Sequence, residues 1–176
     1  ALDEGYRLID TAASYFNETG IGEAIKESHI PRSELFITTK VWVQDSGYEN
    51  TIKAFNQSLT NLGLDYLDLY LIHQPYGNYY GSWKAMEELY RQGKVRAIGV
   101  CNFSAERFVD LCLNCLIKPM INQIELHPFF QQKELVKVLE QYHCKVQAWG
   151  PLNEGQRDIF NNEILEAIAK KHNKTT

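Results

Sequence analysis

The sequence predicts an α/β protein built on a parallel sheet, and within that class a (β/α)₈ TIM barrel of which about six βα units are present. Two observations predict this fold. Short β-rich runs alternate with stretches of helical periodicity, and successive runs begin about 24 to 34 residues apart, the length of a βα unit. Four of the runs also end in a polar side chain suited to catalysis: Asp10, Lys40, His73 and Gln123.

Six strands are expected, each a short run rich in apolar and β-branched residues. They lie at about 7–10, 35–39, 67–72, 95–100, 120–124 and 144–149. Lys40 stands near the end of the second run, Leu-Phe-Ile-Thr-Thr-Lys-Val-Trp. Because a buried ammonium is costly unless it is paired, this position predicts a partner for the Lys40 cation.

Helices are expected between the strands, and several carry their own start or stop signals. The segment 83–92 ends at Gly93, which has the position of a C′ glycine. Ser104 is placed to cap the next helix, and Asn161 or Asn162 a later one. The apolar face of the segment 83–92 consists of Trp83, Met86, Leu89 and Tyr90.

Two parallel architectures fit this alternation. An open, doubly wound sheet that binds a dinucleotide usually has a G-x-G-x-x-G turn after its first strand. The nearest pattern here, Gly20-Ile21-Gly22, falls within an expected helix start and lacks the third glycine. In a (β/α)₈ barrel, catalytic groups come from the carboxyl ends of several strands, which is the pattern of the four polar side chains above. The barrel is therefore favoured.

Composition and charge exclude several classes of protein. The 176 residues are 44% hydrophobic, which suits one substantial core, and the net charge of −4 argues against a nucleic-acid partner. We expect neither a membrane partner nor a secretory leader, because no apolar run approaches the roughly 20 residues of a membrane span. A cytoplasmic location with buried or half-buried thiols is expected, and the Cys-x-x-Cys pair leaves metal or redox use open. The thiols are Cys101, Cys112, Cys115 and Cys144.

Each candidate side chain, taken alone, has a structural explanation. Asp10 can cap the turn after its strand, Lys40 can reach solvent, and His73 can be a hydrogen-bonded structural histidine. Tyr15 can pack in a loop, and Trp149 can be a core aromatic. A barrel that brings these polar groups to one rim favours function instead, because Asp, Lys, Tyr and His together suit proton transfer to a carbonyl oxygen.

Six motifs, in order along the chain, resemble those of the aldo-keto reductases. They are Gly-Tyr-Arg-Leu-Ile-Asp-Thr-Ala-x-x-Tyr-x-Asn-Glu, Phe-Ile-Thr-Thr-Lys-Val-Trp, Asp-Leu-Tyr-Leu-Ile-His-Gln-Pro, Ile-Gly-Val-Cys-Asn-Phe, Asn-Gln-Ile-Glu-Leu-His-Pro and Ala-Trp-Gly-Pro-Leu. The resemblance covers essentially the whole chain and is greatest to microbial reductases of small aldehydes, ketones and keto sugars. It implies a barrel enzyme that reduces a small carbonyl substrate with NADPH, and it does not exclude NADH.

By this resemblance, Asp10, Tyr15, Lys40 and His73 form the catalytic tetrad. Tyr15 would protonate the carbonyl oxygen while hydride arrives from the nicotinamide. A free tyrosine has a pKa of about 10, and a cation beside the phenol stabilises its phenolate, which is the role implied for Lys40. Asp10 would hold Lys40, and His73 would donate a hydrogen bond to the carbonyl oxygen. No metal is expected, because the hydride carrier is organic.

The resemblance also implies the contacts to cofactor and substrate. Asn102 and Gln123 would hold the nicotinamide carboxamide, and Trp149 would stack on its ring where the family commonly has Tyr. Cys101 stands where Ser is more usual, which weakens or removes one hydrogen bond to the carboxamide. Gly150 and Leu152 complete the implied cofactor site. The substrate would meet His73, Trp42 and Tyr76.

The family's first and last barrel strands have no counterpart here, nor does its basic loop for the adenosine 2′-phosphate. We therefore expect residues 1–176 to form one incomplete barrel domain belonging to a longer reductase. Family members are monomers, but unpaired strand edges would favour self-association. Two other functions remain open. In the first, Lys40 is a Schiff-base lysine in an aldolase-like barrel. In the second, the chain is a non-catalytic binding or structural protein.

Overall fold

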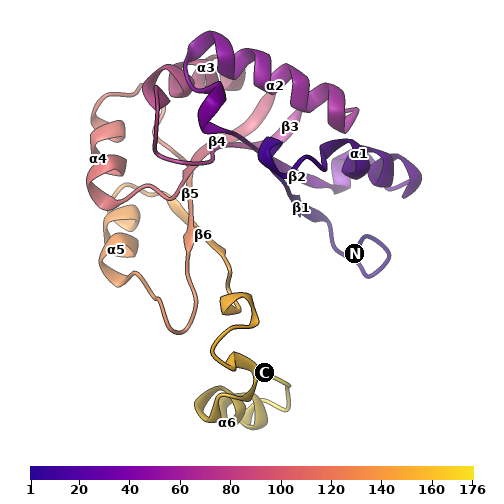
Figure 1. Ribbon diagram of the computed structural model, residues 1–176, viewed down its shortest axis with the longest axis vertical. Coiled ribbons are helices and arrows are strands. Elements are labelled where there is room, and N and C mark those ends of the chain that lie inside the picture. Colours follow the sequence, from indigo (N-terminus) through magenta and orange to yellow (C-terminus); the bar gives the residue numbers. More distant parts are fainter.

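The computed structural model describes residues 1–176 as a sheet curled into an arch, with helices along its outer side (Figure 1). The six strands lie in chain order, and every neighbouring pair is parallel. This arrangement is a half-barrel of βα units, so the predicted fold class is confirmed. The strands are β1 (Leu8–Asp10), β2 (Phe36–Val41), β3 (Leu67–Ile72), β4 (Val95–Cys101), β5 (Ile121–Glu125) and β6 (Lys145–Trp149).

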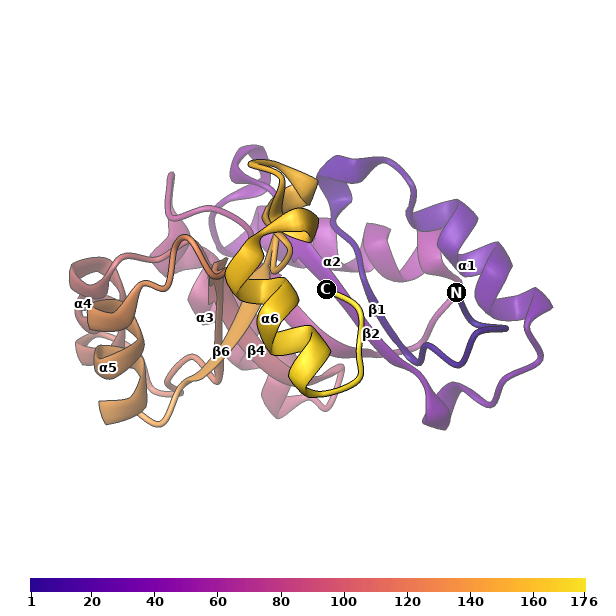
Figure 2. The same ribbon diagram turned by 90° about the horizontal axis from the view of Figure 1, so that it is seen from below.

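A helix follows each strand. Helices α1 to α5 cover the outer side of the arch, whereas α6 lies beneath its open side (Figures 1 and 2). No helix has the length and apolar character needed to cross a bilayer. The helices are α1 (Glu18–Glu27), α2 (Tyr48–Leu62), α3 (Tyr79–Arg91), α4 (Ala105–Leu113), α5 (Lys133–Gln141) and α6 (Glu163–Lys171). Short 3₁₀ turns are η1 (Ala13–Tyr15), η2 (Arg32–Glu34), η3 (Val43–Asp45), η4 (Asn153–Gly155) and η5 (Ile159–Asn161).

The start and stop signals mostly act as predicted. Asn162 caps α6 by accepting from the backbone N–H groups of Ile164 and Leu165, at 3.2 and 3.3 Å. Gly93 follows α3 with a φ of +70°, as a C′ glycine should. The prediction of 83–92 for α3 was too short at its start, because Asn78 accepts from the Gly81 N–H and begins the helix earlier. Ser104 has the N-cap position of α4, although its hydroxyl makes no capping bond to the backbone.

Alternation along the strands gives the sheet two faces with different contents. The outer face packs against the helices and contributes Ile37, Tyr70 and Ile98 to the main apolar core. The concave face has a small apolar cluster formed by Leu69, Leu71 and Cys101. Lys40 pairs in register with Leu71, so its side chain belongs to this concave face. The fold therefore directs the Lys40 ammonium into the hollow of the arch.

A second buried charge lies on the outer face. Asp68 of β3 is fully buried and accepts the Ile37 N–H of β2 at 2.9 Å. Its carboxylate also pairs with Arg32 at 2.7 Å and with Arg96 of β4 at 2.9 Å. Three donors from neighbouring segments thus satisfy one carboxylate and tie β2, β3 and β4 together at their amino-terminal halves.

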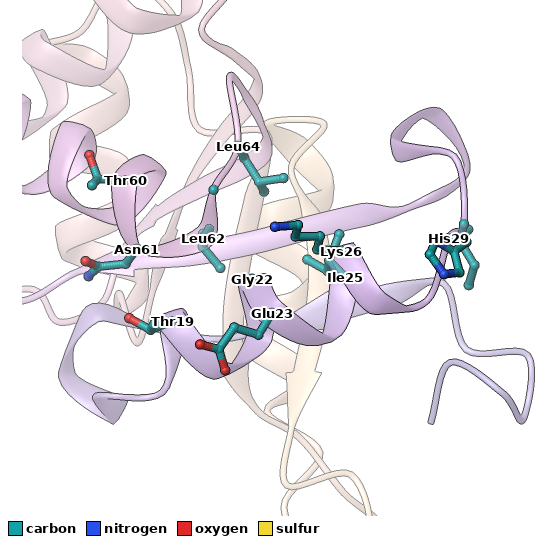
Figure 3. A pocket seen from close by; sticks show the side chains of 12 residues that line it. Thr19, Gly22, Glu23, Ile25, Lys26, His29, Thr60, Asn61, Leu62 and Leu64 are labelled. Carbon is teal, nitrogen blue, oxygen red and sulfur yellow. The ribbon is translucent and has the colours of Figure 1, made fainter.

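Helices α1 and α2 approach closely at a glycine. A side-chain Cβ at Gly22 would lie 2.5 Å from the carbonyl oxygen of Leu62, at the end of α2. Gly22 and Leu62 both line a pocket of about 490 Å³ between the two helices, together with residues such as Lys26 and His29 (Figure 3). None of the predicted site residues lines this pocket. The contact at Gly22 is therefore a packing constraint of the outer layer.

A matched pair of substitutions in α1 tests that constraint. We expect Gly22→Ala to lower the free energy of unfolding by about 1–3 kcal/mol, because its methyl group must displace the α2 backbone. Gly20 is exposed and has no atom within 4 Å of an added Cβ. Gly20→Ala should therefore raise stability by about 0.5–1 kcal/mol through helix propensity alone. Urea denaturation measures both, and changes of the same sign would contradict close packing at Gly22.

Candidate active site

The site is built around the Lys40 ammonium, which lies in the concave face and is 1% exposed. Lys40 Nζ pairs with Asp10 Oδ1 and also donates to the carbonyl oxygen of Thr11 at 3.0 Å. Asp10 is the last residue of β1 and Lys40 lies near the end of the adjacent β2, so the sheet itself brings them together. The partner that the sequence required for Lys40 is present.

Tyr15 lies beside this ion pair. It ends the 3₁₀ turn η1, which directly follows β1, and it is 50% exposed. Lys40 Nζ lies 5.3 Å from the centroid of the Tyr15 ring. The Tyr15 hydroxyl donates to no protein group, so its proton stays available at the rim. A phenol near a cation and open to solvent can give a proton to a bound molecule.

His73 follows β3 and packs against two aromatic rings. Its imidazole lies edge-on to Tyr15 and to Trp42, with ring centroids 5.6 and 5.0 Å apart. Ser14 Oγ lies 3.4 Å from His73 Nδ1, a weak hydrogen bond. Burial lowers the pKa of His73 to about 4, the Lys40 cation adds to this, and Asp10 opposes it. His73 is therefore a neutral imidazole at neutral pH.

Gln123 of β5 reaches across the arch to Asp10. Its Nε2 donates to Asp10 Oδ2 at 2.7 Å, and the Cys101 thiol donates weakly to its Oε1 at 3.8 Å. Burial raises the pKa of the Cys101 thiol, which therefore stays protonated. The sequence placed Asp10, Lys40 and Gln123 at one rim, but it gave no sign of a direct bond between Asp10 and Gln123.

Asn102 and Trp149 lie next to His73 and are joined to each other by a hydrogen bond. Asn102 has a left-handed backbone, with a φ of +62°, and its Nδ2 donates to the carbonyl oxygen of His73 at 3.1 Å. The Trp149 Nε1–H donates to Asn102 Oδ1 at 2.8 Å. An amide has two N–H donors and two acceptor lone pairs, so Asn102 and Gln123 each keep one N–H and some acceptor capacity unused. Those groups suit a ligand carboxamide, which offers one acceptor and one donor group.

The other predicted contact residues are more scattered. Trp42 follows β2 and touches the site through His73. Tyr76 is 60% exposed, and its ring faces the Arg107 guanidinium at 5.8 Å instead of the tetrad. Gly150, with a φ of +57°, and Leu152, which is 54% exposed, follow β6 at the same rim and make no hydrogen bond to the tetrad side chains.

Comparison with known proteins agrees with this geometry. Residues 1–176 match the family model described as the Aldo/keto reductase family. A glyoxal reductase of Bacillus subtilis (strain 168) is 52% identical over 176 residues, which cover 99% of this chain and 63% of that protein. The chain belongs to the aldo/keto reductase family.

Solved structures of this family have the same arrangement of elements. An aldo-keto reductase from a Medee basin deep-sea metagenome library superimposes with a TM-score of 0.96 at 49% identity, covering 99% of this chain and 65% of that one. The Bombyx mori aldo-keto reductase in complex with NADP gives a TM-score of 0.92 at 36% identity, covering 99% and 64%. The chain spans 62% to 64% of the length of the first three curated relatives that it matches.

The four cysteines of the chain are all free thiols. Cys101, Cys112 and Cys144 are buried and Cys115 is half-buried, so the expectation of buried or half-buried thiols is confirmed. Burial raises the pKa of Cys112 and of Cys144 to about 12. Burial also raises the pKa of Cys115, so both thiols of the Cys-x-x-Cys pair stay protonated and are poor nucleophiles.

Residues that the sequence did not single out complete the site. Ser14 lies in the same 3₁₀ turn as Tyr15, and the Thr11 carbonyl follows β1 directly. Their closeness in sequence to Asp10 and Tyr15 was the available signal. Neither carries a charge or an aromatic ring, so residue type alone did not distinguish them from ordinary loop residues.

The depressed pKa of His73 predicts a pH effect on stability. As the pH falls below the ordinary histidine value of 6.5, the unfolded chain takes up this proton before the folded one. The contribution of His73 is therefore fully present above pH 6.5 and is lost as the pH falls toward about 4. We expect the free energy of unfolding, from urea titrations, to fall more steeply across this window in the wild type than in His73→Gln.

The exposed His172, the C-cap residue that follows α6, provides the control for this measurement. His172→Gln should keep the slope of the wild type, because its exposed side chain makes no hydrogen bond or ion pair in the folded chain. If the wild type and His73→Gln show parallel pH profiles, the imidazole of His73 is not held neutral by its surroundings.

Proposed function

We propose that the protein reduces small aldehydes or ketones to alcohols, with NADPH, or NADH in its place, as the hydride donor. The observation that carries this proposal is the convergence of Tyr15, Lys40 and His73 at one rim, beside amide groups suited to a carboxamide. The B. subtilis relative is named a glyoxal reductase, which supports a small carbonyl compound as substrate. The NADP bound to the Bombyx mori protein supports the nicotinamide cofactor.

A bound reduced nicotinamide would supply the hydride for the carbonyl carbon. Tyr15 gives its hydroxyl proton to the carbonyl oxygen, so one hydride and one proton convert the carbonyl group to an alcohol. Lys40 stabilises the phenolate that remains on Tyr15, and Asp10 holds the ammonium in place. His73, as a neutral imidazole, donates a hydrogen bond that orients the carbonyl oxygen and stabilises charge developing there.

The remaining side chains bind and orient. Asn102 and Gln123 would hold the nicotinamide carboxamide with their unused amide groups, and Trp149, fixed by its bond to Asn102, would offer the ring a flat surface. Gly150 and Leu152 extend this cofactor site, and the Cys101 thiol lies beneath Gln123. The substrate lies between His73, Trp42 and Tyr76, whose aromatic rings suit a small apolar or semi-polar compound.

The geometry argues against Lys40 as a Schiff-base lysine. A nucleophilic lysine needs a free amine with access to the substrate. Lys40 is 1% exposed and is bonded to Asp10 and to the Thr11 carbonyl. These contacts hold it as a buried cation, a role that fits the stabilisation of a phenolate better than the attack on a carbonyl carbon.

Replacement of the acid tests the proposal. We expect Tyr15→Phe to lower kcat for glyoxal or methylglyoxal by about 10²–10⁴-fold, because the proton donor is lost while the ring remains. The loss of the NADPH absorbance band measures the rate. Tyr6→Phe is the control, since Tyr6 is also exposed but precedes β1 at the opposite end of the sheet. Full activity in Tyr15→Phe would reject Tyr15 as the acid.

Binding of NADPH is measured separately by fluorescence titration. Both variants should bind NADPH in the micromolar range like the wild type, because neither hydroxyl is a proposed cofactor contact. Absence of binding to the wild type would favour the non-catalytic alternative, a binding or structural protein, over the reductase.

A further inference from the structure

One hydrogen bond in the site joins strands that are not neighbours. Gln123 Nε2 on β5 donates to Asp10 Oδ2 on β1 at 2.7 Å, and strands β2, β3 and β4 lie between them in the sheet. The bond therefore crosses the hollow of the arch. A side-chain amide that donates to a carboxylate makes a charge-assisted hydrogen bond, which is stronger and shorter than a neutral one.

This bond completes the coordination of Asp10. One carboxylate oxygen pairs with Lys40 Nζ and the other accepts from Gln123. Asp10 ends a strand of only three residues at the edge of the sheet, and its side chain is 26% exposed. Its backbone alone leaves the carboxylate free to rotate about the side-chain bonds. Because each oxygen has a separate donor, the carboxylate plane is fixed.

The position of the Lys40 ammonium depends on the orientation of the Asp10 carboxylate. Its only hydrogen-bond acceptors are Asp10 and the Thr11 carbonyl, and it lies over the Tyr15 ring. A rotation of the Asp10 carboxylate would move the cation relative to the phenol. We infer that Gln123 is a positioning residue for the proposed proton transfer: it holds Asp10, and through Asp10 it holds Lys40 beside Tyr15. This inference rests on the proposed function.

Gln123 can have this role and still meet a nicotinamide. Asp10 uses one of its N–H donors and the Cys101 thiol contacts its oxygen weakly, which leaves one N–H and acceptor capacity. Asn102 differs in this respect. Its donor goes to the His73 carbonyl and its oxygen accepts from Trp149, so it has no contact with Asp10. The two amides can therefore be separated by experiment.

The first test uses the protein without cofactor and does not depend on activity. Isotope-edited NMR follows protonation of the Asp10 carboxyl with pH in the wild type, Gln123→Leu, Gln123→Glu and Asn102→Ala. Loss of a donated bond makes a carboxylate easier to protonate, so the midpoint should rise by about one pH unit in Gln123→Leu. It should rise further in Gln123→Glu, whose carboxylate faces Asp10, and stay unchanged in Asn102→Ala.

Gln123→Glu keeps the size and shape of the side chain, so it carries the test if Gln123→Leu does not fold. Unchanged midpoints in the folded Gln123 variants would overturn the inference, because the bond to Asp10 would then have no influence on the carboxylate.

The second test uses steady-state kinetics, with the concentrations of NADPH and methylglyoxal each varied in turn. A positioning role predicts that Gln123→Leu lowers kcat by about 10- to 100-fold and moves the acid limb of its pH profile to higher pH. Asn102→Ala should raise the KM for NADPH and keep the acid limb of the wild type. If Gln123→Leu raises only the KM for NADPH, Gln123 is a cofactor contact without a positioning role.

The two tests separate the inference from the proposed function. A wild type that reduces no carbonyl compound would reject the function, whereas the NMR midpoints would still report whether Gln123 holds Asp10. An active wild type with unchanged midpoints would reject the inference alone.

Discussion

The buried Lys40 ammonium is the constraint on which the rest of the site depends. A cation that is 1% exposed must be paired, and the carboxylate that pairs with it stands at the end of the neighbouring strand. This requirement fixes the placement of β1 beside β2, and with it the turn η1 that follows β1 and presents Tyr15. The position of the proposed acid is thus a consequence of how the fold neutralises one buried charge.

Much of this arrangement could be predicted from the sequence, because it depends on local patterns. Apolar runs located the strands, and the carboxyl ends of adjacent parallel strands meet at one rim, which placed Asp10, Lys40 and His73 together. The cap of α6 was also predictable, since Asn162 bonds to N–H groups two and three residues further along the chain. Such contacts depend on spacing along the chain and not on the shape of the sheet.

Two of the contacts that escaped prediction depend on that shape. The bonds from Gln123 to Asp10 and from Trp149 to Asn102 join strands brought close by the curl of the sheet, a quantity that no residue pattern encodes. The surroundings of α6 escaped prediction for a related reason. Its apolar face was clear in the sequence, yet Ile164 remains 71% exposed, since an amphipathic pattern does not specify which surface will cover it.

Two paired carboxylates of the sheet, Asp68 and Asp10, differ in the bonding capacity of the groups around them. Asp68 is fully buried and bonded to Arg32, Arg96 and the Ile37 N–H, so its bonding capacity is used within the protein. Asp10 is also bonded through both oxygens, but the groups around it can form further hydrogen bonds. Next to Lys40 the Tyr15 hydroxyl donates to nothing, and Gln123 keeps an N–H. Unused bonding capacity beside a fixed charge is what a bound molecule can exploit, and in this structure it surrounds Asp10 and not Asp68.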